Sequence, residues 1–273
     1  MAGNFWQSSH CQQWILDKQE IELERQRDRK VISHDEIQKM YIFYANFIQS
    51  LGETLKFRQQ IIATAIVYFK RFYAKNSFSD VDPVLLAPTC LCLASKVEEY
   101  GVPSPVKFTV TIGNAVKQKY SQTIGEFKYP SNRICECEFL LLEMLDCCLI
   151  VYHPYRPLTQ YIADIGQEEA LLPTAWRIVN DSYRCDVCLM YPPYLIALAA
   201  IHMAAVVHRK DIKQWFVELA VDMSKVLEIT HCLLELYELW KKYDEEKEIL
   251  AILAKIPKPV THIDKPVATS SAS

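Results

Sequence analysis

The sequence predicts an all-α fold, and three observations support this prediction. Apolar residues recur at helical spacing along most of the chain, glycine and proline cluster between those stretches, and no stretch alternates apolar and polar residues as a strand would. Of the 273 residues, 51% are hydrophobic and only six are glycine. A chain of this length and composition can bury one large core or two medium ones, and we expect two domains.

The first two elements follow from charge and capping patterns. Residues 10–30 form a separate, charged, amphipathic segment rich in Gln, Glu and Arg, which predicts a helix on the domain surface. The next helix begins at Ser33, because Ser33 and Glu36 can cap each other's free backbone amides, and it runs to Gly52. A further helix is expected over residues 57–73.

The helix after this one has an unusual composition. Asp82 is a suitable N-cap, and Pro83 occupies the first helical position, where proline is favoured. Residues 84–97 are apolar on every side and rich in small side chains, so this helix should be the centre of a five-helix bundle. Pro88 predicts either a kink or a boundary inside it. Two more helices complete the bundle, near residues 105–119 and 131–148.

The pattern then starts again after a proline-rich hinge at residues 152–157. Segment 194–207 aligns with 84–97 at a shift of 110 residues (194 − 84), and each follows a proline and takes third place in its set. The expected helices of this second set lie near residues 155–165, 172–187, 193–207, 211–218 and 222–242. The chain therefore divides into an N-terminal segment and helix (1–32), a first bundle (33–151), a second bundle (152–256) and a disordered tail rich in Pro, Ser and Thr (257–273).

Composition excludes several classes of function. Thirty Lys and Arg oppose 33 Asp and Glu, a net charge of −3, so the chain lacks the basic field that attracts nucleic acid. Without a signal peptide or an apolar run of membrane-spanning length, we expect a soluble intracellular protein whose ten cysteines are reduced. No phosphate-cradling glycine loop, nucleophile elbow or kinase signature is present, so we expect neither an enzyme nor a cofactor.

Specific motifs make the chain resemble the cyclin family. The arrangement of two five-helix bundles behind a separate helix resembles the double cyclin box. Residues 93–99, Leu-Ala-Ser-Lys-Val-Glu-Glu, resemble the signature that ends the central helix of the box, and residues 68–72, Tyr-Phe-Lys-Arg-Phe, resemble the end of its second helix. Residues 4–10 and 146–158 are most similar to the transcriptional cyclins, and the resemblance covers about residues 4–257.

The resemblance implies a regulatory role. A cyclin of this kind binds and activates the cyclin-dependent kinase of the Mediator kinase module, alongside other Mediator subunits, and regulates RNA polymerase II transcription in the nucleus. It contributes no catalytic group, and it turns the kinase's mobile helix inward. The family uses a Lys and a Glu to hydrogen-bond the kinase backbone beside that helix, at positions that match Lys96 and Glu138. We expect both on the bundle surface, where reversing their charges would leave thermal stability nearly unchanged.

One departure from the family pattern concerns substrate docking. Cell-cycle cyclins carry an arginine-containing docking motif in the first helix of the box, whereas residues 40–44 here read Met-Tyr-Ile-Phe-Tyr. The usual acidic partner of that arginine falls at Lys70. Both features favour a transcriptional cyclin, and substrate docking by that route is not expected.

A second binding surface is expected on the helix over residues 172–187. At about 100° per residue, Leu172, Ala175, Val179 and Ser182 face the core, whereas Asp181 and Arg184 point outward. Trp176 and Asn180 lie beside each other at the margin, and this mixture of aromatic and polar groups suits an interface. We hypothesise that Trp6, Trp176, Asn180 and Asp181 form a groove for a third protein, a Mediator subunit.

Other interpretations remain open. The Cys185-x-x-Cys188 spacing resembles a zinc motif, but without a second pair we expect core thiols and no metal. His34-Asp35 resembles the metal-binding dipeptide of HD-domain phosphohydrolases, although the capping box already explains this stretch. Transcription factor IIB shares the double-bundle fold, but its zinc ribbon and basic surface are missing here. A helical scaffold without a kinase partner is the remaining alternative.

Overall fold

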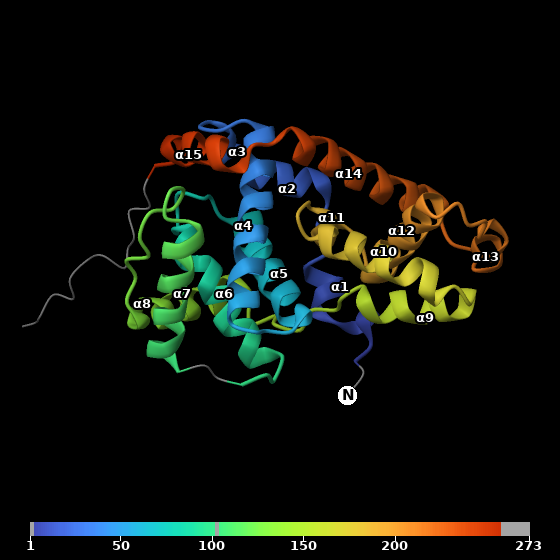
Figure 1. The fold of residues 1–273 in the computed structure, drawn as a ribbon, viewed down its shortest axis with the longest axis horizontal. Helices are drawn as coiled ribbons and strands as arrows, with labels where there is room; N and C mark the ends of the chain where they lie inside the picture. Colours follow the sequence, from blue (N-terminus) through green and yellow to red (C-terminus); the bar gives the residue numbers. More distant parts are fainter. Residues whose placement is uncertain (1–2, 102–103, 258–273) are drawn as a thin grey trace, which may run out of the picture.

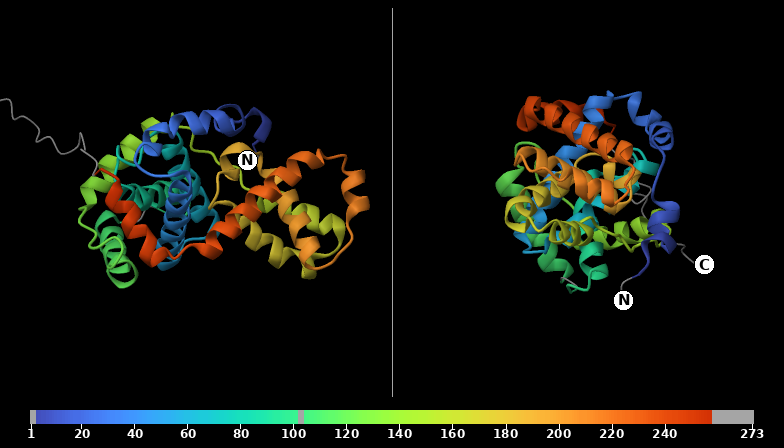
Figure 2. Two further views of the ribbon diagram at one scale, coloured as in Figure 1. Left: turned by 90° about the horizontal axis from the view of Figure 1, so that it is seen from above. Right: turned by 90° about the vertical axis from the view of Figure 1, so that its right-hand side faces the viewer.

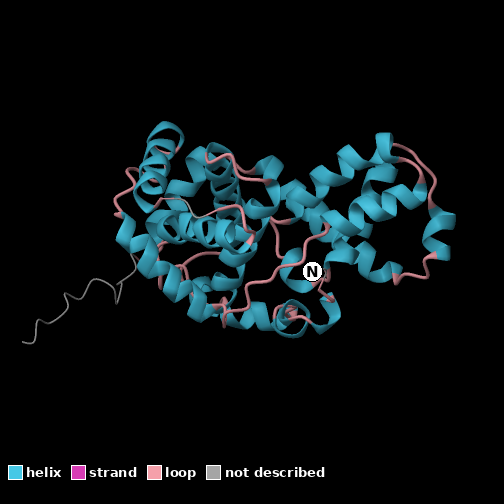
Figure 3. Cartoon of the chain, turned by 90° about the horizontal axis from the view of Figure 1, so that it is seen from below, coloured by secondary structure: helices cyan, strands magenta, loops and turns pink. Residues whose placement is uncertain are grey.

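The computed structural model describes residues 3–101 and 104–257, and these residues contain helices and loops but no strand (Figure 3). Two groups of helices lie next to each other along the longest axis of the molecule (Figure 1). The first group consists of α4 (His34–Thr54), α5 (Gln59–Lys75), α6 (Pro83–Val97), α7 (Pro105–Lys119) and α8 (Ser131–Met144). The second consists of α9 (Tyr155–Ile165), α10 (Glu168–Ser182), α11 (Val187–Met190), α12 (Pro193–Val207), α13 (Lys213–Glu218) and α14 (Met223–Lys242).

The all-α prediction is confirmed, and so is the central helix of the first bundle. The capping box at the start of α4 is present, since Ser33 N–H donates to Glu36 Oε2 (2.8 Å) and Glu36 N–H donates to Ser33 Oγ (3.3 Å). α6 packs against α4, α5 and α8, and it continues through Pro88 without a boundary. α12 packs against α9, α10 and α14 in the same way. Each bundle therefore surrounds one apolar helix.

The N-terminal segment differs from the single surface helix expected over residues 10–30. It consists of η1 (Phe5–Gln7), α1 (Ser9–Gln13), α2 (Lys18–Glu24) and α3 (Gln26–Arg29). Trp14, in the gap between α1 and α2, is fully buried, and Leu16 N–H donates to the carbonyl of Leu189 at 2.8 Å. The segment is broken because it follows the junction between the two bundles, where backbone and aromatic contacts replace helical hydrogen bonds.

Two predicted helices end elsewhere. The helix expected over 131–148 stops at Met144, because Asp146 and Cys147 take left-handed φ values of 50° and 53° and their amides bond back to Glu143 and Leu142. The helix expected over 172–187 begins four residues earlier, at Glu168, and ends at Ser182. Residues 187–190 form the separate helix α11.

One helix was missed altogether. α15 (Glu245–Lys255) follows the second bundle in sequence but packs on α4 of the first, with Ile249 and Ile252 buried (Figures 1 and 2). Asp244 precedes it, and apolar residues recur at helical spacing within it, so the sequence contained a signal. Apart from Pro257, the tail predicted to be disordered (257–273) lies outside the described residues. None of the helices that the structure describes has the length and apolarity needed to span a bilayer.

Candidate functional site

An ion pair joins the last turn of α6 to α8. Lys96 Nζ donates to both carboxylate oxygens of Glu138, at 2.6 and 2.7 Å. α6 ends at Val97, so Lys96 lies in its final turn, where a cation complements the helix dipole. Burial acts to lower the pKa of Lys96, but the hydrogen bond to Glu138 and the charges of neighbouring groups together outweigh burial and raise that pKa. Lys96 is therefore charged at neutral pH.

The two partners differ in exposure. The Lys96 side chain is 34% exposed and the Glu138 side chain only 11%, so the expectation that both lie on the surface is wrong for Glu138. Glu138 is covered because α8 packs against α6. Its neighbour Phe139 is 75% exposed. Of these features, the uncovered aromatic ring is typical of protein-binding surfaces, where aromatic side chains are enriched.

Two of the four residues expected to form a second groove, Trp176 and Asn180, contact Tyr155. Trp6, 59% exposed, lines a cavity of about 790 Å³, and so does Tyr155. The Tyr155 ring packs against Trp176 with centroids 4.6 Å apart, and its hydroxyl donates to Asn180 Oδ1 at 2.8 Å. Among the described residues, the lining includes Trp6 but not Trp176, Asn180 or Asp181. Tyr155 therefore connects Trp176 and Asn180 to the cavity.

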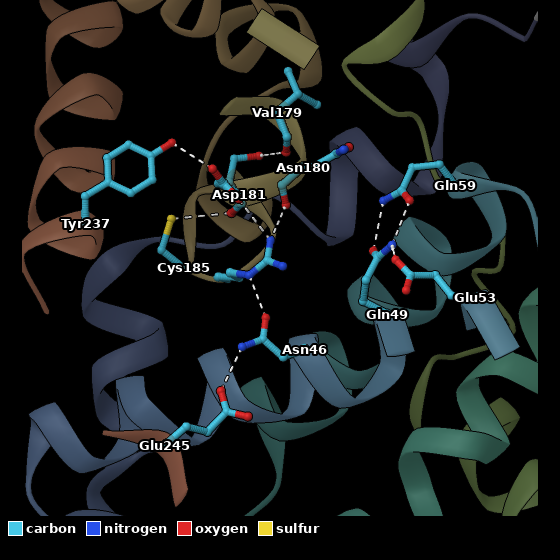
Figure 4. A network of polar contacts seen from close by, with 12 residues as sticks. Asn46, Gln49, Glu53, Gln59, Val179, Asn180, Asp181, Cys185, Tyr237 and Glu245 are labelled. Atoms are coloured by element: carbon cyan, nitrogen blue, oxygen red, sulfur yellow. Dashed lines mark hydrogen bonds and ion pairs between the residues drawn. The ribbon is translucent and has the colours of Figure 1, made fainter. Parts of the chain in front are cut away.

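Asp181 belongs to a network between the two bundles (Figure 4). Its carboxylate accepts from the Tyr237 hydroxyl on α14 (3.0 Å) and from Arg184 (3.2 Å). Arg184 also donates to Asn46 on α4 (2.9 Å), and Asn46 donates to Glu245 at the start of α15 (2.9 Å). The prediction that Asp181 and Arg184 point outward is thus wrong, because α4, α14 and α15 cover that side of the helix.

Comparison with protein-family models identifies two consecutive domains, which correspond to the two bundles. Residues 13–150 match the family model of the cyclin N-terminal domain, and residues 153–256 match that of the cyclin C-terminal domain. The chain belongs to the cyclin family.

This cyclin is similar to proteins named Cyclin-C. It is 60% identical to that of Rattus norvegicus over 260 residues, which cover 95% of this chain and 92% of the relative. The identity to Cyclin-C of Drosophila melanogaster is also 60%, covering 95% and 98% of the two chains. For Cyclin-C of Caenorhabditis elegans it is 38%, covering 95% and 94%.

Solved structures share the fold of this cyclin at low identity. A chain in the CAK complex of Chaetomium thermophilum bound to ATP-gamma-S superposes with a TM-score of 0.72 at 21% identity, covering 93% of this cyclin and 89% of that chain. A chain in the yeast RNA Pol II CTD kinase CTDK-1 complex gives a TM-score of 0.67 at 18% identity, covering 82% and 73%.

A buried ion cluster in this cyclin was not predicted. Asp186, before α11, accepts from Arg25 Nη1 and Nη2 at 2.5 and 2.9 Å and from Lys70 Nζ at 3.3 Å. Both cations lie over the Tyr41 ring, at 4.6 and 4.3 Å from its centroid. Burial acts to raise the pKa of Asp186, but the charges of Arg25 and Lys70 hold it far below its usual value. The lysine at the usual acidic docking position therefore joins the two bundles and the N-terminal segment.

The paired cysteines are part of the core of the second bundle. Cys185 and Cys188 are buried, and burial raises the pKa of their thiols to about 12 and about 11. The described part of the chain contains no group of three or more His, Cys, Asp or Glu placed to hold a metal ion.

Proposed function

We propose that this cyclin binds and activates a cyclin-dependent kinase of the Mediator complex, regulating RNA polymerase II transcription in the nucleus without a catalytic group of its own. The observation that carries the proposal is the Lys96–Glu138 pair beside exposed Phe139. The cyclin family docks its kinase at this end of the central helix. The identity to proteins named Cyclin-C and the fold shared with complexes titled CAK and RNA Pol II CTD kinase support the proposal.

The proposed mechanism is differential binding. The cyclin binds the active conformer of the kinase more tightly than the inactive one, and a shift from 1:99 to 99:1 requires about 10⁴-fold preference. One ion pair cannot supply such a preference, so the interface must be broad, on the order of 1,200 Å² or more. Lys96 and Glu138 would fix the register, and Phe139 would supply apolar contact area.

The direct test measures phosphorylation of an RNA polymerase II C-terminal-domain peptide by the purified Mediator-module kinase, with and without this cyclin. We expect the cyclin to raise the rate by up to about 100-fold, because a shift from 1:99 to 99:1 raises the population of the active conformer by that factor. A TFIIB-like factor would instead bind promoter DNA, and a scaffold would do neither. Absence of both kinase binding and activation would refute the proposal.

We also propose that Trp6, Trp176, Asn180 and Asp181 contribute to binding another Mediator subunit. The aromatic cavity supports this, because Trp6 and Tyr155 line it while Trp176 and Asn180 hold Tyr155 in place. Asp181 acts indirectly, since its carboxylate bonds Tyr237 and Arg184.

Trp6→Ala is expected to weaken third-partner binding by at least about tenfold while kinase affinity stays unchanged, because an exposed aromatic anchor is lost and no core packing is disturbed. Pull-downs of the binary and ternary complexes from purified components measure both effects. Leu250→Ala is the control, since it removes another exposed apolar side chain, on α15. Loss of kinase and third partner together would contradict separate surfaces.

A further inference from the structure

The first described residues of this cyclin cross the junction between the two bundles. Residues 3–16, here termed the N-terminal strap, carry α1, which lies between α5 and α9 in Figure 1. Leu16 N–H donates to the Leu189 carbonyl (2.8 Å), and the Tyr152 N–H donates to His10 Nδ1 (3.0 Å). The strap is thus held by these polar contacts, by ring contacts from Phe5, Trp6 and His10 to the second bundle and its hinge, and by the fully buried ring of Trp14.

Directly under that ring lies a buried cation without a counter-charge. Arg71 on α5 is 1% exposed, and its guanidinium lies 4.9 Å from the Trp14 ring centroid. Nη1 donates to the Cys148 carbonyl (3.1 Å), but Nε and Nη2 have no partner, and no carboxylate of the described residues pairs with Arg71. Buried Arg25, by contrast, makes two bonds to Asp186. An unpaired buried charge destabilises the state that encloses it.

The strap itself contains two buried hydrogen-bond donors that have no partner in the part of the chain that the structure describes. Trp14 Nε1 has no partner. His10 accepts at Nδ1, so its neutral ring carries the proton on Nε2, which also has no partner. Four buried nitrogens of Arg71, Trp14 and His10, all of them donors, thus have no hydrogen-bond partner among the described protein atoms. Lifting the strap would expose the Trp14 and His10 nitrogens, which belong to it, and the side of the Arg71 guanidinium that the Trp14 ring covers.

Closure of the strap is thus a balance of opposing effects. It buries Trp14 between Arg71 and Lys75, which is favourable, but it also encloses the Arg71 charge without a carboxylate partner among the described residues, which is unfavourable. We propose that the strap opens and closes over Arg71 while both bundles stay folded. Phe5 and Trp6 of the strap line the aromatic cavity, so closure completes that cavity and opening removes one wall. Only this consequence for a third partner rests on the proposed function.

Native-state hydrogen exchange on the full chain tests the opening. Amides of residues 9–16 should exchange at least tenfold faster than the buried amides of α5, at a rate that low denaturant concentrations do not change, because a local opening exposes little surface. Strap amides as protected as those of α5 would overturn the proposal. This measurement needs no variant and no kinase.

Arg71→Met should slow hydrogen exchange of the strap amides by about tenfold, because methionine keeps most of the packing volume and removes the buried charge that has no carboxylate partner in the described chain. Lys75→Met is the matched control. Its Nζ lies over the same ring at 4.3 Å, but the side chain is 42% exposed, so its loss relieves no burial and should not slow exchange. Unchanged or faster strap exchange in Arg71→Met would overturn the proposal.

Cys148 gives an independent readout, because its Sγ donates to Gln13 Oε1 of the strap at 3.0 Å. Its alkylation rate, resolved by peptide mass spectrometry, should rise severalfold in Trp14→Ala and fall in Arg71→Met. The neighbouring thiol of Cys147 is exposed and should react at the same rate in every variant. Equal changes at both cysteines would indicate general loosening and would refute a local strap.

Discussion

Replacing Asp186 with asparagine is expected to lower the free energy of unfolding by about 3–5 kcal/mol, the usual cost of removing one partner from a buried ion pair. The change leaves Arg25 and Lys70 as two buried cations near each other over the Tyr41 ring. Urea denaturation followed by circular dichroism measures the effect. Glu235→Gln, in an exposed pair with His231 on α14, should leave the midpoint unchanged.

The effect of Asp186→Asn should depend on pH in a defined direction. The folded-state pKa of Asp186 is depressed, so its stabilisation is fully present at neutral pH and is lost as the pH falls below the ordinary value near 4. The difference in stability between wild type and variant should therefore shrink under acid conditions. A difference that stays constant from pH 7 to pH 3 would show that the carboxylate charge is not what stabilises the junction.

Exchanging the charges of Lys96 and Glu138 should affect the stability of the protein and its affinity for the kinase differently. Lys96→Glu alone puts two carboxylates together, one of them largely buried, and is expected to weaken both stability and kinase binding. Adding Glu138→Lys restores the ion pair in reverse, so stability should return towards the wild-type value. Kinase affinity should stay at least about 30-fold weaker, because groups on the kinase would face the wrong charge.

Thermal denaturation and kinase affinity, measured on the same samples, check this expectation. Lys96→Met shows how much of the loss comes from removing the charge, and Lys247→Glu tests whether charge reversal at an exposed pair elsewhere matters. If the double variant activated the kinase like wild type at limiting cyclin concentration, Lys96 and Glu138 would have no part in recognition.

Local signals in the sequence predicted most of the helices. The Ser33–Glu36 capping box and the Asp82–Pro83 start are short-range chemistry, and the structure has both. Segments 84–97 and 194–207 are apolar on all sides, which a helix tolerates only when other helices surround it. These features need no knowledge of the rest of the chain.

The paths of the terminal segments and the partners of charged residues required the tertiary structure. The composition of residues 10–30 is that of a solvated surface helix, yet Trp14 and Arg25 are buried at the bundle junction. In the sequence, Lys70 is notable only because the cyclin family usually has an acidic residue at this position. Its ion-pair partner, Asp186, lies 116 residues further along the chain and could not be predicted from local signals.

Helical periodicity also placed Asp181 and Arg184 on an outward face. A helical wheel shows which residues share a side, but it does not show what covers that side, and here α4, α14 and α15 do. The sequence by itself determined the local helices, the two apolar central helices and the resemblance to cyclins. Only the tertiary structure decided which charges are paired, how far Glu138 is buried and what lies under the N-terminal strap, because those properties depend on residues distant in sequence.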